Sequence, residues 1–262
     1  MKKWYIVSCL SLLFLFIGII YYKLFSVRYS LQGKKVIFSN KIADTTVNNS
    51  PESKNNKTLI YNRDSISKNN LPKQIVIKDV PFIVQAPFSN WQVHHESCEE
   101  ASALIVHNYL SGYKDLDMKL IDLTIRDMKE FQIKRYGEEK DLYNEDFVEL
   151  IKQYFKYKNV KAYTNATLLD LKTKLSQGIP VIVQVNAGML SNPNMRHNGY
   201  HVLVAIGYDD DKQNIITNDP GTIHGKMYSY SYSRFESAMV KGGSVIIAIE
   251  DNIDNRNILS KI

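Results

Sequence analysis

The longest apolar stretch of the chain lies near its start. Residues 4–22 carry no charged side chain, and Lys3 and Lys23 flank them. At about 1.5 Å per residue, a helix of this length matches the ~30 Å hydrocarbon core of a bilayer. A cleaved signal peptide would have a shorter apolar region and an A-x-A-like site, which this segment lacks. We therefore predict a cytoplasmic tip and an uncleaved transmembrane anchor over residues 1–25, with a cleaved signal peptide as the alternative.

A polar segment rich in Asn, Lys, Ser and Thr follows the apolar run. Residues 30–73 include NNSPESKNNK and SKNNLPK and have almost no aromatic pattern, so they bury too little apolar surface to fold. Residues 1–78 carry thirteen Lys and Arg against three Asp and Glu, whereas the rest of the chain carries twenty against twenty-four. We predict a basic, disordered tether over residues 26–78, either simply solvated or in contact with anionic lipid or wall polymer. Nucleic-acid binding is not indicated.

The remaining chain has patterns typical of one folded domain, predicted over residues 79–252 with a tail over 253–262. Apolar residues spaced as on one face of a helix begin at Asn144 and at Thr167. Continuous apolar runs at 179–186 and 243–250 predict buried strands. The predicted fold class is α+β.

The only cysteine outside the N-terminal apolar run lies where a helix is expected to begin. Cys9 is the other cysteine of the chain, so the domain cannot form an internal disulfide. Ser97 and Glu100 fit the S-x-x-E capping box, which makes Cys98 the first residue of the helix. The free N–H groups and the helix dipole favour a thiolate there, and we predict a lowered pKa and a nucleophilic role. The alternative is a cysteine that fills the core as a small apolar side chain.

A hairpin predicts a partner for the thiol. Two β-rich runs, 202–208 and 214–218, flank the turn-forming DDDKQ. If position 208 pairs with 212 or 213, position 201 falls opposite 219 or 220, so His201 and Asp219 meet at the open end of the hairpin. A carboxylate there would hold the imidazole in one tautomer. The alternatives are an ordinary histidine at a strand start and an ordinary turn aspartate before Pro-Gly.

Two further residues are candidates for the same site. In VPFIVQAPFSNW we expect a short strand that ends at Gln85, whose amide, with the Cys98 N–H, would stabilise an oxyanion. Trp91 either lines a substrate subsite or is buried packing. His94 is expected in a loop, without the spacing of a closed zinc site, and His107 on the helix surface.

Four segments together carry a family resemblance: VPFIVQAPFSNW, SCEEASALI, GYHVLVAIGYDDD and NDPGT. They resemble the papain-like cysteine peptidases of the C39-like family, related to the bacterial double-glycine-leader, bacteriocin-processing peptidases, over about Asp79 to Glu250. The resemblance implies a papain-like α+β fold with a helical half and an antiparallel β half. It also implies four roles: nucleophile for Cys98, base for His201, orienting acid for Asp219 and oxyanion-hole donor for Gln85.

The chain departs from the transporter-linked members in two respects. Glu99 follows the cysteine where those members typically have Gly, and the chain contains no G-x-x-x-x-G-K-[ST] phosphate loop. We therefore expect a stand-alone peptidase of the C39-like branch.

The expected activity is hydrolysis of peptide bonds in a peptide or protein substrate, without a metal or cofactor. One alternative is a cell-wall amidase or endopeptidase with the same chemistry. A second is a non-catalytic peptide-binding module. The resemblance favours a single-pass protein of the cell membrane with its domain outside, although the count of positive flanking residues does not favour export.

Overall fold

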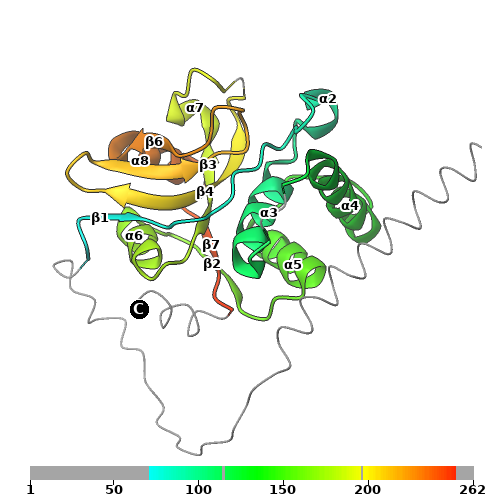
Figure 1. The fold of residues 1–262 in the computed structure, drawn as a ribbon, viewed down its shortest axis with the longest axis horizontal. Coiled ribbons are helices and arrows are strands. Elements are labelled where there is room, and N and C mark those ends of the chain that lie inside the picture. Colours follow the sequence, from blue (N-terminus) through cyan, green and yellow to red (C-terminus); the bar gives the residue numbers. More distant parts are fainter. Residues whose placement is uncertain (1–70, 114–115, 196, 252–262) are drawn as a thin grey trace, which may run out of the picture. The chain divides into compact units, whose positions relative to one another are not determined.

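The computed structural model describes residues 71–113, 116–195 and 197–251. These residues form helices packed on an antiparallel sheet whose strands differ in length (Figure 1). Within the described ranges, no helix combines the length and the apolar character needed to cross a bilayer. The predicted anchor and the C-terminal tail lie outside the described residues.

Seven strands make up one sheet. Six follow the order β2-β7-β3-β4-β5-β6, and all pairings are antiparallel. The seventh, β1, pairs with the second half of β4 on the edge opposite β5. The strand bounds are β1 Gln74–Val76, β2 Val160–Tyr163, β3 Val181–Asn186, β4 Tyr200–Asp209, β5 Asn214–Asn218, β6 Tyr228–Ser231 and β7 Ile246–Ile249.

Helices cover both faces of the sheet. The long ones, α3, α4 and α5, gather on one side, and α6 and α8 lie on the other (Figure 1). The helix bounds are α2 Trp91–His94, α3 Cys98–Ser111, α4 Met118–Tyr136, α5 Asn144–Phe155, α6 Leu168–Ser176, α7 Ala187–Leu190 and α8 Tyr232–Lys241.

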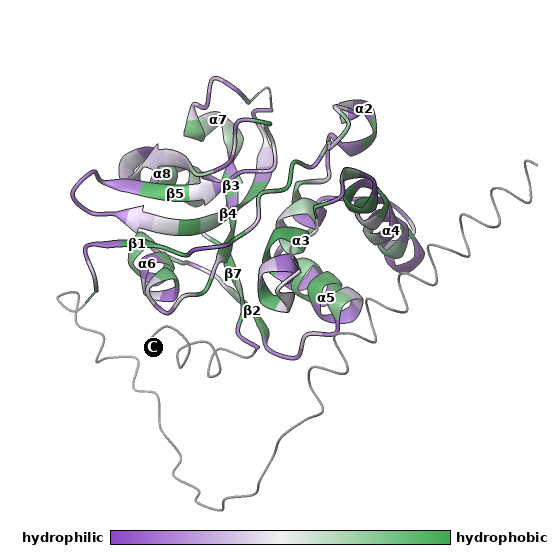
Figure 2. Cartoon of the chain, viewed as in Figure 1, coloured by the Kyte–Doolittle hydropathy of each residue, from purple (hydrophilic) through white to green (hydrophobic). Residues whose placement is uncertain are grey.

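The central strand β4 contributes to two separate cores. Val202 and Val204 pack with α3 and α5, whereas Leu203 and Ala205 face the core built with α6 and α8. A strand covered on both faces has no polar alternation, and β4 accordingly has an unbroken apolar run from Val202 to Ile206, with polar residues toward its ends (Figure 2). The packing of α3 against β4 brings the start of the helix to the start of the strand.

Several predicted elements are confirmed. Helices begin at Asn144 and directly after Thr167, whose side chain and that of Asp170 form a reciprocal capping box. Strands β3 and β7 lie within the two apolar runs. The α+β fold class is confirmed as a mixture of helices and an antiparallel sheet.

Two predictions near the N-terminal side of the domain are wrong. Residues 80–85 are not a strand; they are held by contacts such as the Asn218 Nδ2 bonds to the carbonyls of Val80 and Pro81, at 3.2 and 3.0 Å. The fold also begins earlier than residue 79, because β1 lies inside the segment predicted as tether. Gln74–Val76 pair with β4, and this pairing makes the end of the predicted tether part of the sheet.

Candidate active site

Cys98 is the first residue of α3, as predicted, but the capping box is absent. The Ser97 hydroxyl makes no cap hydrogen bond and instead contacts Nδ1 of His94 at 3.2 Å. The Glu100 carboxyl accepts a hydrogen bond from Gln132 of α4. Both side chains are buried. Each forms a hydrogen bond with a side chain of a neighbouring helix, His94 or Gln132, instead of with a backbone N–H at the start of α3.

Contacts with α4 hold the segment before Cys98. Nε2 of the fully buried His94 lies 2.8 Å from Oδ1 of Asp122, and Nζ of Lys129 donates to the Val93 carbonyl at 2.7 Å. Burial lowers the pKa of His94 although Asp122 opposes this. His94 is thus a buried anchor, and its prediction as a loop residue is wrong.

The Cys98 thiol is buried and contacts a carboxyl group. Its Sγ donates to Oε2 of Glu99 at 3.0 Å, and 4% of the residue is exposed. Burial, followed by the neighbouring Glu99, raises the thiol pKa, and the backbone N–H of Val202 acts weakly in the opposite direction. The predicted lowering of the pKa is wrong, because desolvation and a like charge outweigh the helix start.

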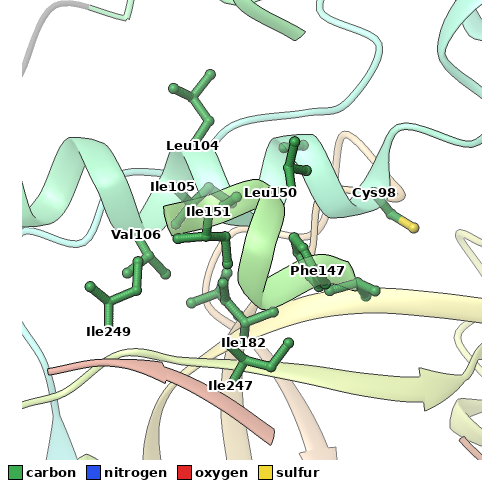
Figure 3. Close-up of a cluster of buried hydrophobic side chains, with 14 of the residues drawn as sticks. Cys98, Leu104, Ile105, Val106, Phe147, Leu150, Ile151, Ile182, Ile247 and Ile249 are labelled. Atoms are coloured by element: carbon green, nitrogen blue, oxygen red, sulfur yellow. The ribbon is translucent and has the colours of Figure 1, made fainter. Parts of the chain in front are cut away.

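Cys98 lies at the edge of a core rather than inside it. Figure 3 shows its sulfur directed away from Leu150 and Ile151, which pack in the centre of the cluster. The same α3 is tied to β4 one turn further on, where the Ser102 hydroxyl donates to the Val202 carbonyl at 3.1 Å. The nucleophile candidate therefore adjoins the strand residue that follows His201.

His201 and Asp219 are in contact, as the hairpin predicted. Nε2 of His201 lies 2.8 Å from Oδ1 of Asp219, and both residues are buried. The Tyr230 hydroxyl donates to Oδ2 at 2.6 Å, and the Gly221 N–H donates to Oδ1 at 3.0 Å. Burial raises the pKa of Asp219, but His201, Tyr230 and Gly221 outweigh it and lower that pKa below its usual value.

The register of the hairpin differs from the predicted one. Tyr208 pairs with Ile215, and a bulge between Ala205 and Gly207 shifts the register by one. The His201–Asp219 contact still forms because Asp219 follows the end of β5. At Gly221 a Cβ would lie 2.8 Å from Cε1 of His201. The turn therefore has room for the imidazole ring only because residue 221 has no side chain.

Gln85 links the two sides of the site. Its backbone N–H donates to the Pro220 carbonyl at 3.1 Å. Its side-chain Nε2 donates to the carbonyls of His94 and His95, at 2.7 and 3.0 Å, and its buried Oε1 accepts no hydrogen bond from the residues that the structure describes. In this structure the amide thus holds the turn before Cys98.

The other predicted residues lie around this centre or away from it. Trp91 is half-buried at the start of α2. His107 is buried, with Nδ1 3.0 Å from the Tyr157 hydroxyl and its ring stacked on Phe155, so its prediction as a surface residue is wrong. Asp122 and Tyr230 were missed, because their partners lie 28 and 11 residues away and no local motif marks them.

A cavity of about 340 Å³ opens beside the site. Tyr143 and Tyr200 line it, with ring centroids 4.5 Å apart, and Tyr200 directly precedes His201. Gln184 also lines it, and its buried Oε1 has no hydrogen-bond partner in the described part of the chain. The cavity has room for a side chain of a bound molecule and a polar group at its wall.

Comparison with known proteins identifies the family. The model of the Peptidase_C39 like family matches residues 77–242. The chain belongs to this family. It is therefore a cysteine-type peptidase, and its one cysteine within the matched range is Cys98.

Two solved structures are similar to the peptidase. One is described as a C39-like peptidase from Bacillus anthracis, with 18% identity, a TM-score of 0.49 and coverage of 68% of this chain and 97% of that chain. The other is xylellain, a cysteine protease from Xylella fastidiosa, with 12% identity, a TM-score of 0.32 and coverage of 68% and 86%. A search of the curated proteins finds no match.

Proposed function

We propose that this peptidase hydrolyses peptide bonds with Cys98 as nucleophile, His201 as base and Asp219 as orienting acid, on a papain-like fold. The buried His201–Asp219 hydrogen bond of 2.8 Å, at the end of β4 nearest the start of α3, is the observation that carries the proposal. Nε2 of His201 is engaged by Asp219, which leaves Nδ1 for the thiol.

The reaction begins with the thiol turning from Glu99 toward His201. Within the described residues no hydrogen bond joins Cys98 to His201, so this rotation precedes catalysis. The thiol proton then passes to Nδ1 of His201, and the thiolate attacks the substrate carbonyl carbon. The imidazolium returns that proton to the leaving amine as the C–N bond breaks, and water hydrolyses the thioester.

Two N–H donors are available for the oxyanion. The Cys98 N–H lies in the first turn of α3, where the helix offers no acceptor. The Gln85 amide is the second, and it must release the carbonyl of His94 or His95 to act. A donor of this kind accelerates turnover by about 10² to 10³.

The cavity beside Tyr200 is the proposed binding site for part of the peptide substrate. Its aromatic walls suit an apolar or aromatic side chain.

The proposed setting of the activity is a membrane surface. The apolar run of residues 4–22 supports a single-pass anchor, and the resemblance to the C39-like peptidases supports a peptidase domain outside the membrane. Protease digestion of intact cells tests this orientation: the basic segment before residue 71 should be cleaved from outside, and its protection would overturn the assignment.

The activity is tested with the full-length protein and a mixed peptide library read by mass spectrometry. Cys98→Ser and His201→Ala should abolish cleavage, and Asp219→Asn should lower kcat by about 10² to 10⁴. His224→Ala, which alters an exposed histidine near the site, is the control and should cleave normally. Retained cleavage in Cys98→Ser would overturn the proposal, and digestion of purified cell wall by the wild type alone would favour the amidase alternative.

A further inference from the structure

The carboxyl of Glu99 touches the sulfur atom that the proposed reaction uses. Oε2 accepts the Cys98 thiol hydrogen bond at 3.0 Å, and Oε1 accepts from the Leu142 N–H at 3.0 Å. Only 1% of Glu99 is exposed. Both oxygens are therefore occupied, one by the nucleophile and one by the loop between α4 and α5.

The backbone of Leu142 connects this contact to β4, the strand that carries His201. Its carbonyl accepts the Tyr200 hydroxyl at 2.7 Å, and Tyr200 is the residue before His201. The backbone of one residue, Leu142, thus bonds Glu99 through its N–H and β4 through its C=O. The thiol, Glu99, Leu142 and Tyr200 form a continuous chain from the nucleophile to the neighbour of the base.

We infer that Glu99 is a positioning residue for the nucleophile: its buried carboxyl holds the Cys98 thiol in a resting orientation and aligns it with β4 through Leu142. The inference rests on the proposed function, since it assigns Cys98 as the nucleophile. A thiol that donates to Glu99 is withheld from His201, and attack on a substrate requires this bond to break.

The charge on Glu99 decides how strongly the resting state is held. Burial raises the pKa of Glu99 to about 7, against the hydrogen bonds from Cys98 and Leu142. The titratable groups facing it are Cys98 and Glu100 on α3, Asp141 and Tyr143 on the loop between α4 and α5, and Tyr200 on β4. Among the described residues, no lysine or arginine forms an ion pair with it.

The sign of the effect follows from these neighbours. Below about pH 7 Glu99 is neutral and places no negative charge beside a thiolate. Above that pH it is an anion next to the sulfur, and the thiol becomes harder to ionise. Glu99 thus restrains the nucleophile most on the alkaline side.

Glu100 supplies a matched control on the same helix. It is equally buried, but its carboxyl contacts Gln132 rather than the thiol. Burial and the neighbouring Glu99 raise its pKa well above the usual value. Glu100→Gln therefore removes a neighbouring buried carboxyl group without removing a contact to the thiol.

The test is the pH profile of Cys98 alkylation by iodoacetamide in the full-length protein, followed by peptide mass spectrometry so that Cys9 is counted separately. In Glu99→Gln the midpoint should fall by about one pH unit or more, since a like charge this close shifts a pKa by about 1 to 3. In Glu100→Gln the midpoint should fall by less than in Glu99→Gln, because Glu100 raises the thiol pKa less than Glu99 does and makes no contact with the sulfur. A Glu99→Gln profile that coincides with the wild type would overturn the inference.

A second measurement needs no variant, in case Glu99→Gln does not fold. In the wild type, the logarithm of the alkylation rate should rise with a slope below one around pH 7, because ionisation of Glu99 progressively suppresses the thiolate. A unit slope through that range would overturn the inference. If Glu99→Gln shifts the alkylation profile but the wild type cleaves no peptide, the proposed function is wrong, whereas the effect of Glu99 on the reactivity of the Cys98 thiol is upheld.

Discussion

Gln85 donates both amide hydrogens of its side chain to the carbonyls of His94 and His95, at 2.7 and 3.0 Å. The residue predicted to stabilise an oxyanion is therefore also the residue that holds the turn before the nucleophile. An oxyanion donor matters only for attack on a carbonyl group, whereas the turn before Cys98 matters for every reaction of the thiol. Kinetic measurements can therefore separate the two roles.

Gln85→Ala should lower kcat for peptide hydrolysis by about 10² to 10³ if the amide stabilises the oxyanion. Alkylation of Cys98 forms no oxyanion, so its rate should stay at the wild-type value. The two rates are measured on the same preparation. Loss of both would instead assign Gln85 to positioning of the turn, and loss of neither would remove it from the mechanism.

Gly221→Ala should displace the base. The new Cβ would lie 2.8 Å from Cε1 and 3.1 Å from Nε2 of His201, closer than real carbon atoms approach, so the ring must move. A displacement of about 1 Å in a catalytic group costs about 10²-fold, and we expect kcat/KM to fall by that order. A variant with wild-type kinetics would mean that the imidazole position is not critical.

His94→Ala should destabilise the fold, whereas His95→Ala should not. His94 is fully buried between Asp122 and Ser97, and its removal leaves buried polar groups unpaired at a cost of about 1 to 3 kcal/mol. The His95 side chain is 66% exposed and serves as the control. Urea denaturation measures both free energies of unfolding, and equal values for the two variants would contradict the anchoring role of His94.

Glu250 should contribute to stability in a pH-dependent way. Burial opposes its ionisation, but hydrogen bonds from Lys174, Tyr163 and Lys161 outweigh this and lower its pKa from 4.5 to about 2. A carboxyl with a lowered folded-state pKa stabilises the fold above the unfolded pKa and loses this contribution as the pH falls through the folded one.

Glu250→Gln should therefore be less stable than the wild type at pH 7. The difference should shrink as the pH falls from 4.5 to about 2, where the wild-type carboxyl is also neutral. Thermal unfolding of both proteins across this range measures it. A difference that does not depend on pH would assign the effect to packing instead of charge.

The local patterns of the chain predicted what depends on near neighbours in sequence. The start of α3 at Cys98, the hairpin that joins His201 to Asp219, and the helices after Tyr143 and Thr167 all follow from spacing within a few residues. These features were predicted correctly although the patterns missed details such as the bulge in β4. The reason is that backbone geometry restricts how a hairpin or a helix end can form.

Only the tertiary structure decided which partner each buried polar group has. Ser97 and Glu100 match a capping box, yet α2 and α4 offer them better-buried partners. The thiol of Cys98 sits at a helix start, yet burial and Glu99 raise its pKa. Desolvation depends on every segment that covers a residue, including Leu142, which is 43 positions from Glu99. That information is not local, so the sequence by itself determined the candidate residues and the elements that carry them, and the fold determined their burial and their partners.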